Sequence, residues 1–168
     1  GYSAVTMRDL ARAMGIKAAS LYNHIQSKQE ILSTIIIDLA EEFTTGMDQI
    51  ATSEETTIQK LENIIALHID VTLRNADGLA SLNNDWMHLE EKNLQYFEKM
   101  RHEYEENFSD IIRKGVKEKE IKPYNIDIMV FSTLSTLRTL YLWYPKQGTI
   151  DAEILKKDMI SVLLKGVI

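Results

Sequence analysis

The chain has 168 residues, a length that suits one compact domain or a small module joined to a larger one. Its apolar and charged fractions, 45% and 26%, are ordinary for a globular protein, which argues against disorder. It has no cysteine, which excludes a disulfide framework and a thiolate zinc site. No apolar run is long enough to cross a bilayer, so no membrane partner is expected. No secretory leader is recognisable, so a cytoplasmic location is expected.

The charge is unevenly distributed along the chain. The whole chain carries a net charge of −6. Residues 1–30 carry +2, because they hold four basic residues against two acidic ones: Arg8, Arg12, Lys17 and Lys28 against Asp9 and Glu30. The other 138 residues carry −8. A small basic module on an acidic body is typical of a local surface that contacts phosphates.

The pattern of the first thirty residues predicts two short helices and the start of a third. Thr6 is a candidate N-cap with Asp9 three residues later, and an apolar stripe follows as far as Met14. Gly15 then stops this helix. A second helix is expected at about 18–24, and Ser27 with Glu30 forms a capping box that opens a third.

The spacing of small and apolar residues in 6–22 favours a helix-turn-helix. Two helices that cross steeply at close range need a small residue at the crossing, which Ala11 provides. The turn between them needs a residue that tolerates positive φ, which Gly15 provides. Apolar residues on both sides are expected to hold the angle: Leu10, Met14, Ile16 and Leu21. The alternative is a helical hairpin with no role in DNA binding.

The remainder of the chain predicts longer amphipathic helices. Their expected ranges, set by breakers such as Asp77-Gly78, Lys122-Pro123 and Pro145, are 54–75, 77–89, 91–120, 124–144 and 151–167. No strand pattern and no internal repeat is evident. We therefore expect an all-α fold with a helix-turn-helix domain and connecting helix at 1–48, and a helical bundle domain at 49–168.

The N-terminal stretch resembles the signature of the TetR family of transcriptional regulators. The residues that carry the resemblance are Gly1-Tyr2, Thr6-Met7, Leu10-Ala11, Met14-Gly15-Ile16, Leu21-Tyr22, Lys28 and Ile31-Leu32. The family has a further helix before this stretch, which is absent from this chain. Two residues depart from the pattern: Lys17 replaces the usual Ser or Thr cap of the second helix, and Ile25 replaces an aromatic residue.

The resemblance implies that the second helix enters the major groove of double-stranded operator DNA. Tyr22, Lys28 and Thr6 would contact phosphates. Lys17, Ala18, Ser20 and Asn23 would face base edges or nearby phosphates. His24 is either a phosphate contact or a half-exposed residue at the helix end.

The two C-terminal segments, 124–144 and 151–167, are rich in apolar residues. The first is apolar on more than one face and needs cover on most sides. The resemblance implies that these helices form a four-helix bundle in a homodimer. The dimer would set two helix-turn-helix domains about 34–36 Å apart on a palindromic operator. The alternative is a purely internal core.

A ligand pocket is expected among 54–75, 77–89, 91–120 and 124–144. Aromatic and methionine side chains with few polar groups would suit a lipophilic effector. The candidates are His68, Ile69, Trp86, Met87, Phe97, Met100, Arg101, Tyr104, Phe131, Ser135 and Arg138. Plain core packing is the alternative for each one. Arg138 is a charge in an apolar helix, so it needs an anion or an acidic partner from 91–120.

A looser resemblance concerns the effector. Arg101 to Glu105, Gly115, Trp143-Tyr144 and Gly148 resemble the TetR subgroup that controls fatty-acid and sterol breakdown, which implies an acyl-coenzyme A thioester or a similar lipophilic anion. No catalytic pair, cofactor motif or phosphate loop is evident, so no enzyme activity and no cofactor are expected. Asp85 and His88 could hold a metal, but a structural role is favoured. The alternative function is a helical ligand-binding or scaffolding protein with a non-functional reader.

Overall fold

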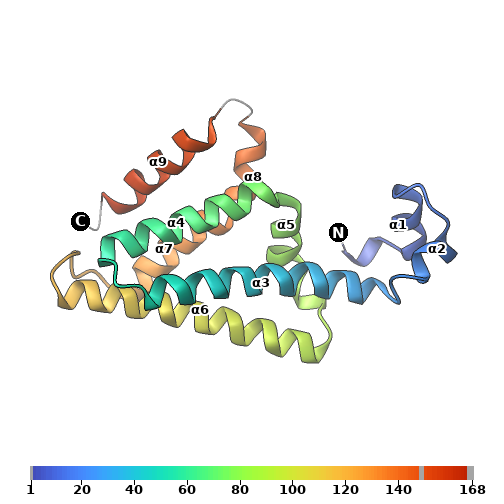
Figure 1. Cartoon of the computed structure of the whole chain (residues 1–168), viewed down its shortest axis with the longest axis horizontal. Coiled ribbons are helices and arrows are strands. Elements are labelled where there is room, and N and C mark those ends of the chain that lie inside the picture. Colours follow the sequence, from blue (N-terminus) through green and yellow to red (C-terminus); the bar gives the residue numbers. More distant parts are fainter. Residues whose placement is uncertain (1, 148–149, 166–168) are drawn as a thin grey trace.

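The computed structural model describes residues 2–147 and 150–165. Every regular element in these ranges is a helix, which confirms the all-α class (Figure 1). Gly1, Gly148 and the last residues of the expected final helix lie outside the described residues. No helix in the described ranges combines the length and apolar character that crossing a membrane requires.

The reader consists of η1 (Tyr2–Ala4), α1 (Met7–Ala13) and α2 (Ala18–Tyr22). Thr6 and Asp9 form the expected capping box at the start of α1. Gly15 has φ of +69°, as the turn requires. A small core of Met7, Ala11 and Leu21 holds the two helices together, and Ile25 packs against it. The crossing and the turn are therefore as predicted.

Two apolar residues of the predicted reader core are exposed instead. Met14 is 62% exposed and Ile16 is 38% exposed. Both flank Gly15, where the chain leaves α1 and turns outward before α2 begins. The angle between the helices is therefore held by Ala11, Leu21 and their neighbours, without these two side chains.

A single long helix, α3 (Lys28–Thr52), joins the reader to the body (Figure 1). Ser27 caps it by accepting a hydrogen bond from the backbone N–H of Glu30. The reciprocal half of the expected box differs, because the Glu30 carboxylate accepts from Gln26 rather than from Ser27. Since α3 continues past residue 48, its second half belongs to the body by packing: Met47 is fully buried there.

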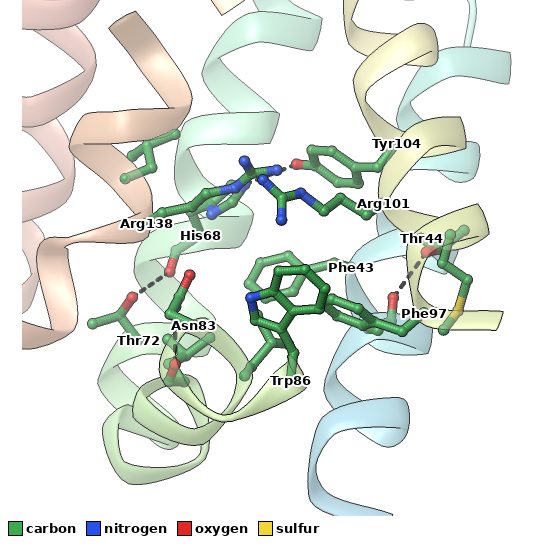
Figure 2. Close-up of a pocket in the computed structure, with 15 residues that line it drawn as sticks. Phe43, Thr44, His68, Thr72, Asn83, Trp86, Phe97, Arg101, Tyr104 and Arg138 are labelled. Atoms are coloured by element: carbon green, nitrogen blue, oxygen red, sulfur yellow. Dashed lines mark hydrogen bonds between the residues drawn. The ribbon is translucent and has the colours of Figure 1, made fainter. Parts of the chain in front are cut away.

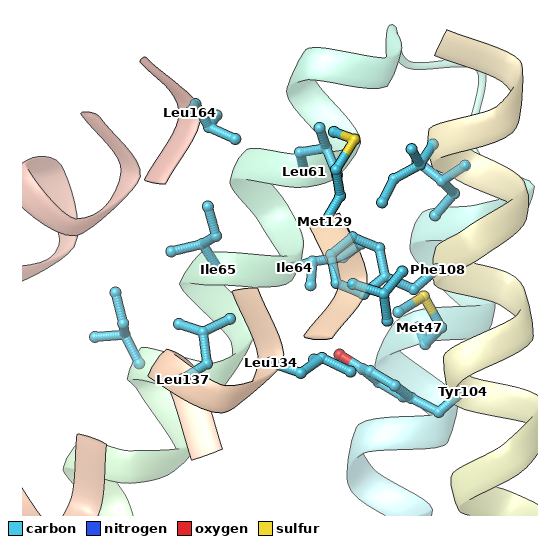
Figure 3. Packing of buried hydrophobic residues seen from close by; sticks show 14 of the residues in the cluster. Met47, Leu61, Ile64, Ile65, Tyr104, Phe108, Met129, Leu134, Leu137 and Leu164 are labelled. Carbon is cyan, nitrogen blue, oxygen red and sulfur yellow. The ribbon is translucent and has the colours of Figure 1, made fainter. Parts of the chain in front are cut away.

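The body packs α4 (Thr57–Arg74), α5 (Ala76–Asn84), the 3₁₀ turn η2 (Trp86–His88) and α6 (Glu91–Lys117) around α3. Phe108 of α6 and Ile64 of α4 are at the centre of the main core, with Met47 beside them (Figure 3). Gly115 lets α6 approach α4, because a Cβ there would lie 2.9 Å or less from all three side-chain atoms of Thr57.

The expected helix 124–144 is divided into α7 (Ile126–Arg138), α8 (Leu140–Trp143) and the 3₁₀ turn η3 (Tyr144–Lys146). The break falls at Thr139, whose hydroxyl donates to the carbonyls of Ser135 and Thr136. The last element, α9 (Ala152–Leu164), starts at Asp151, whose carboxylate accepts from two backbone N–H groups.

Candidate functional site: DNA reader and ligand pocket

The outer face of α2 is open to solvent. Lys17, Ser20, Asn23 and His24 are exposed, and Tyr22 is 52% exposed. Lys17 makes no side-chain hydrogen bond to the start of α2, as its departure from the family pattern predicted. Thr6 is also exposed, but its hydroxyl donates to Asp9 over 2.6 Å. These residues form the surface that the sequence assigned to DNA.

Two predicted DNA contacts are placed differently. Ala18 is half-buried and packs against the core of the reader, so its methyl group supports α2 rather than facing outward. The Lys28 ammonium group donates to the carbonyls of Tyr2 and Val5 over 2.8 and 2.9 Å. It also lies 4.0 Å from the centre of the Tyr2 ring. Lys28 therefore fixes the N-terminal segment, and the structure does not present it as a free phosphate contact.

The body contains a cavity of about 280 Å³ between α3, α4, α5, η2, α6 and α7 (Figure 2). Its lining is Ala40, Phe43, Thr44, His68, Thr72, Leu79, Leu82, Asn83, Trp86, Phe97, Met100, Arg101, Tyr104, Leu137 and Arg138. This volume is at the small end of the range for ligand sites, so the buried part of any ligand is small.

One wall of the cavity is aromatic. Trp86 and Phe97 lie 5.7 Å apart between ring centres, and the Phe43 ring lies 4.7 Å from the His68 ring. Figure 2 shows the rings of Phe43, Trp86 and Phe97 below the guanidinium groups of Arg101 and Arg138. The Arg101 guanidinium lies 5.8 Å from the Trp86 ring centre. Such a wall binds an apolar group by excluding water from it.

The opposite side carries two cations and one anion. Arg138 Nη2 donates to Glu105 Oε1 over 2.7 Å, and Arg101 Nε lies 3.5 Å from the same oxygen. Partial burial raises the pKa of Glu105, but the hydrogen bond and charge of Arg138 and the charge of Arg101 outweigh it, so the pKa is lowered. Glu105 is therefore ionised, and the three groups carry a net charge of +1. Arg138 has the acidic partner from 91–120 that the sequence required.

A buried polar pair completes the cavity. His68 Nε2 and the Tyr104 hydroxyl are 2.8 Å apart, and both residues are buried. Burial, and to a smaller extent the charge of Arg138, lowers the pKa of His68 to about 3. Burial raises the pKa of Tyr104. Both side chains are therefore neutral near pH 7, and the pair adds polarity to the cavity without adding charge.

The His68 environment predicts a specific dependence of stability on pH. An unfolded chain protonates His68 as the pH falls through about 6.5, whereas the folded chain does so only near 3. Since the unfolded state binds more protons between these values, stability falls with falling pH. We expect His68→Gln, which keeps a hydrogen-bonding group but does not titrate, to lack this loss. Urea unfolding should show the stability advantage of the wild type shrinking by about 2 kcal/mol between pH ~7 and ~5.

The comparison of wild type with His68→Gln isolates one histidine, because His24, His88 and His102 are present in both proteins. If the difference in stability between the two proteins is the same at pH 7 and at pH 5, the folded state takes up a proton on His68 as readily as the unfolded state does, contrary to the burial of His68.

The structure brings most of the predicted ligand residues together. His68, Trp86 and Phe97 line the cavity, as do Met100, Arg101, Tyr104 and Arg138. Four predicted residues do not, and we correct them: Ile69, Met87, Phe131 and Ser135. Ile69 is fully buried in the main core. Met87 is 60% exposed and Phe131 is 71% exposed.

The reason for these corrections is helical phase. Adjacent residues differ by 100° around an α-helix, so Ile69 cannot share the direction of His68. Phe131 and Ser135 are four residues apart on the outer face of α7, whereas Leu134 and Arg138 are four apart on its inner face. Met87 follows Trp86 in a 3₁₀ turn and points outward.

Sequence reasoning missed the whole contribution of α3 and of α5. Ala40, Phe43 and Thr44 lie on α3, which the sequence assigned to the reader domain as a connecting helix. On α5 the missed residues are Leu79, Leu82 and Asn83; Thr72 of α4 and Leu137 of α7 complete the set. Their i, i+3, i+4 spacing, as in Ala40-Phe43-Thr44, was the available signal.

Asp85 and His88 have structural roles in this fold. Asp85 Oδ1 accepts a hydrogen bond from the Tyr2 backbone N–H over 3.4 Å. The His88 ring stacks on the Tyr2 ring with centres 5.3 Å apart. Within residues 2–147 and 150–165, no cluster of three or more histidine and acidic side chains is arranged to hold a metal ion.

A short exposed helix held across an alanine-centred crossing defines a helix-turn-helix DNA-binding protein. Comparison with known proteins places the chain more closely. Residues 54–167 match the family described as "Tetracyclin repressor-like, C-terminal domain", and residues 1–35 match "Bacterial regulatory proteins, tetR family". The chain belongs to the TetR family of transcriptional regulators.

Among curated relatives, the chain is similar to the HTH-type transcriptional repressor KstR2 of Rhodococcus jostii (strain RHA1). The two are 28% identical over 176 residues, covering 99% of this chain and 82% of the relative. The chain is also similar to the fatty acid metabolism regulator protein of Bacillus subtilis (strain 168), with 22% identity over 175 residues that cover 99% of this chain and 87% of the relative.

Two solved structures show the same fold. The ketosteroid transcriptional regulator KstR2 of Mycobacterium tuberculosis superposes with a TM-score of 0.92 at 20% identity, covering 99% of this chain and 86% of that one. AibR, solved in complex with isovaleryl coenzyme A and operator DNA, superposes with a TM-score of 0.80 at 18% identity, covering 96% and 88%.

Proposed function

We propose that this regulator is a repressor that binds a palindromic operator as a homodimer and is released by a small lipophilic acid or its thioester. The observation that carries this proposal is the shared helix: α3 begins at the reader and lines the cavity with Ala40, Phe43 and Thr44. A ligand in the cavity therefore contacts the element that orients the reader.

The chemistry of the cavity supports an anionic effector with a compact apolar body. The aromatic wall favours an apolar group, and the net positive charge of the Arg101, Glu105 and Arg138 cluster favours an acid or a polarised acyl group. A cavity of ~150 Å³ holds benzene, so 280 Å³ suits an apolar body of about twice that size. The structure of AibR, which contains isovaleryl coenzyme A and operator DNA together, is consistent with such an effector.

The exposed apolar face of α7, α8 and α9 supports the dimer. Ile128 and Phe131 on α7 are 63% and 71% exposed, and Val162 on α9 is 70% exposed. Leu142 and Trp143 on α8 and Ile154 on α9 are exposed as well. Apolar side chains concentrated on one side of a protein mark an interaction surface. A second copy of the same face would cover it by two-fold symmetry.

The test is operator selection followed by titration. Duplexes selected from a random pool by the purified protein should share a palindrome, and the affinity should fall by at least about 1,000-fold between 50 and 200 mM salt. Tyr22→Phe, which removes the hydroxyl that we expect to contact a phosphate, should weaken binding to all selected sequences alike. Failure to bind any duplex at low salt would refute the regulator and favour a ligand-binding protein with a non-functional reader.

The effector is tested with decanoate, its coenzyme A thioester and its methyl ester as probes. We expect the acid or the thioester to bind the free protein and to release it from the selected duplex. Binding of the neutral ester alone would contradict the anionic effector.

A further inference from the structure

The reader is attached to the body at a second place besides α3. The N-terminal segment η1, which belongs to the reader, contacts η2 and lies between α1 and α5 (Figure 1). The Tyr2 ring stacks on His88 at an interplanar angle of 25°, and the Tyr2 backbone donates to Asp85. Lys28, at the start of α3, holds the same segment through the carbonyls of Tyr2 and Val5.

The same 3₁₀ turn forms part of the cavity. Trp86 lines the cavity, and His88, two residues later, contacts Tyr2. A 3₁₀ helix has three residues per turn, so these two side chains point in different directions from one rigid turn. Gln29 at the start of α3 donates to the carbonyl of His88 over 2.5 Å. A displacement of Trp86 therefore moves the groups that hold Tyr2 and Gln29.

Packing connects the two places as well. One buried cluster consists of Leu32, Ile36, Ala40, Leu89, Phe97 and Met100. Both Tyr2 and Trp86 pack against this cluster, and Ala40, Phe97 and Met100 also line the cavity. The residues against which Tyr2 packs and the residues of the cavity wall therefore belong to one packed cluster. Close-packed clusters transmit displacement because they have few voids to absorb it.

We propose that an effector in the cavity acts on the reader through η2, which we call the joint. The effector would do so by displacing Asp85 and His88, the residues that contact Tyr2. This proposal rests on the proposed function. With α3 alone, the reader could pivot about one helix; the contact of Tyr2 with η2 fixes its tilt. An effector that moves Trp86 releases or resets that tilt, and the two readers of a dimer lose the separation that an operator demands.

One polar atom at the joint, among the residues that the structure describes, has no hydrogen-bond partner. Gln29 Oε1 is buried and has no hydrogen-bond partner within the described part of the chain, although Nε2 of the same side chain binds His88. An unsatisfied buried polar atom costs free energy. This contact is therefore less stable than one in which both ends of the Gln29 amide are hydrogen-bonded.

The experiment measures coupling, defined as the ratio of operator Kd with and without a saturating probe, for decanoate and for decanoyl-coenzyme A. We expect a ratio of about 5 to 150 in the wild type and below about 2 in Tyr2→Ala and His88→Ala. The affinity of the free protein for the probe should be unchanged in both variants, because neither side chain lines the cavity. Tyr2→Phe keeps the ring and should retain coupling.

A matched control is Tyr96→Ala, which removes a half-exposed tyrosine bound to Glu41 outside the cavity lining and should leave coupling intact. Full coupling in both Tyr2→Ala and His88→Ala would overturn the joint while leaving the proposed function standing. Absence of coupling in the wild type would refute the proposed function, and the joint with it. If Tyr2→Ala does not fold, hydrogen exchange decides: the probe should alter exchange at residues 2–5 in the wild type but not in His88→Ala.

Discussion

Replacing Phe131 with glutamate is expected to convert the protein to a monomer and to weaken operator binding by about 100- to 10,000-fold. Phe131 is 71% exposed on α7, three residues after the exposed Ile128, and Val162 on α9 is exposed as well. A carboxylate at the centre of an apolar interface lacks a partner, and an unpaired buried charge is strongly unfavourable. A monomer has one reader, so it loses the gain that comes from binding two half-sites together.

Light scattering after size-exclusion chromatography and titration of the selected duplex measure the two effects. Phe131→Leu keeps an apolar side chain of similar length and should remain dimeric, with nearly unchanged operator affinity. The proposed interface is wrong if Phe131→Glu stays dimeric and binds the duplex as the wild type does.

Substitution of Arg138 by alanine should weaken binding of decanoate or its thioester by about 10- to 100-fold, because it removes the cation nearest Glu105 and the main charge on α7 that faces the cavity. Operator affinity without the probe should be unchanged, since Arg138 lies in the body and not in the reader. Isothermal titration measures the first quantity, and duplex titration measures the second.

Glu105→Gln is the matched variant, and it is expected to change the affinity for the acid in the opposite direction. In the wild type the Glu105 carboxylate pairs with Arg138 and Arg101, so an anionic ligand must compete with it for these two cations. Removing its charge should tighten binding of the acid by about fivefold, a modest gain because these groups are partly exposed and screened by solvent. Binding of the methyl ester should not change. Equal affinity for the acid in all three proteins would show that this cluster does not contact the effector.

The sequence predicts the reader better than the pocket, for a physical reason. In the reader, Ala11 and Gly15 are constrained by local geometry: a close crossing requires a small side chain, and a positive φ favours glycine. Such requirements act over a few residues and are visible in the chain. The exposure of Met14 was not visible, because it depends on which elements cover that side.

The pocket depends on contacts between distant segments. Arg138 was identified because a charge in an apolar helix needs a partner, but the identity of Glu105 depends on how α6 and α7 are packed. Phe131 was assigned to the pocket because composition alone does not separate the inner and outer faces of a helix that is apolar on both. The role of Lys28 in binding Tyr2 was likewise invisible from the pattern, since the two are separated by 26 positions.

The length of α3 restricts how this protein can be rebuilt. Its 25 residues span about 37 Å, and each inserted residue would rotate everything before it by about 100°. A chimera that grafts a foreign reader onto this body must therefore preserve the helical phase of α3. By the proposed coupling, it must also supply an aromatic ring where Tyr2 meets His88, and a reader in the correct phase but without that ring is expected to bind DNA without responding to the effector.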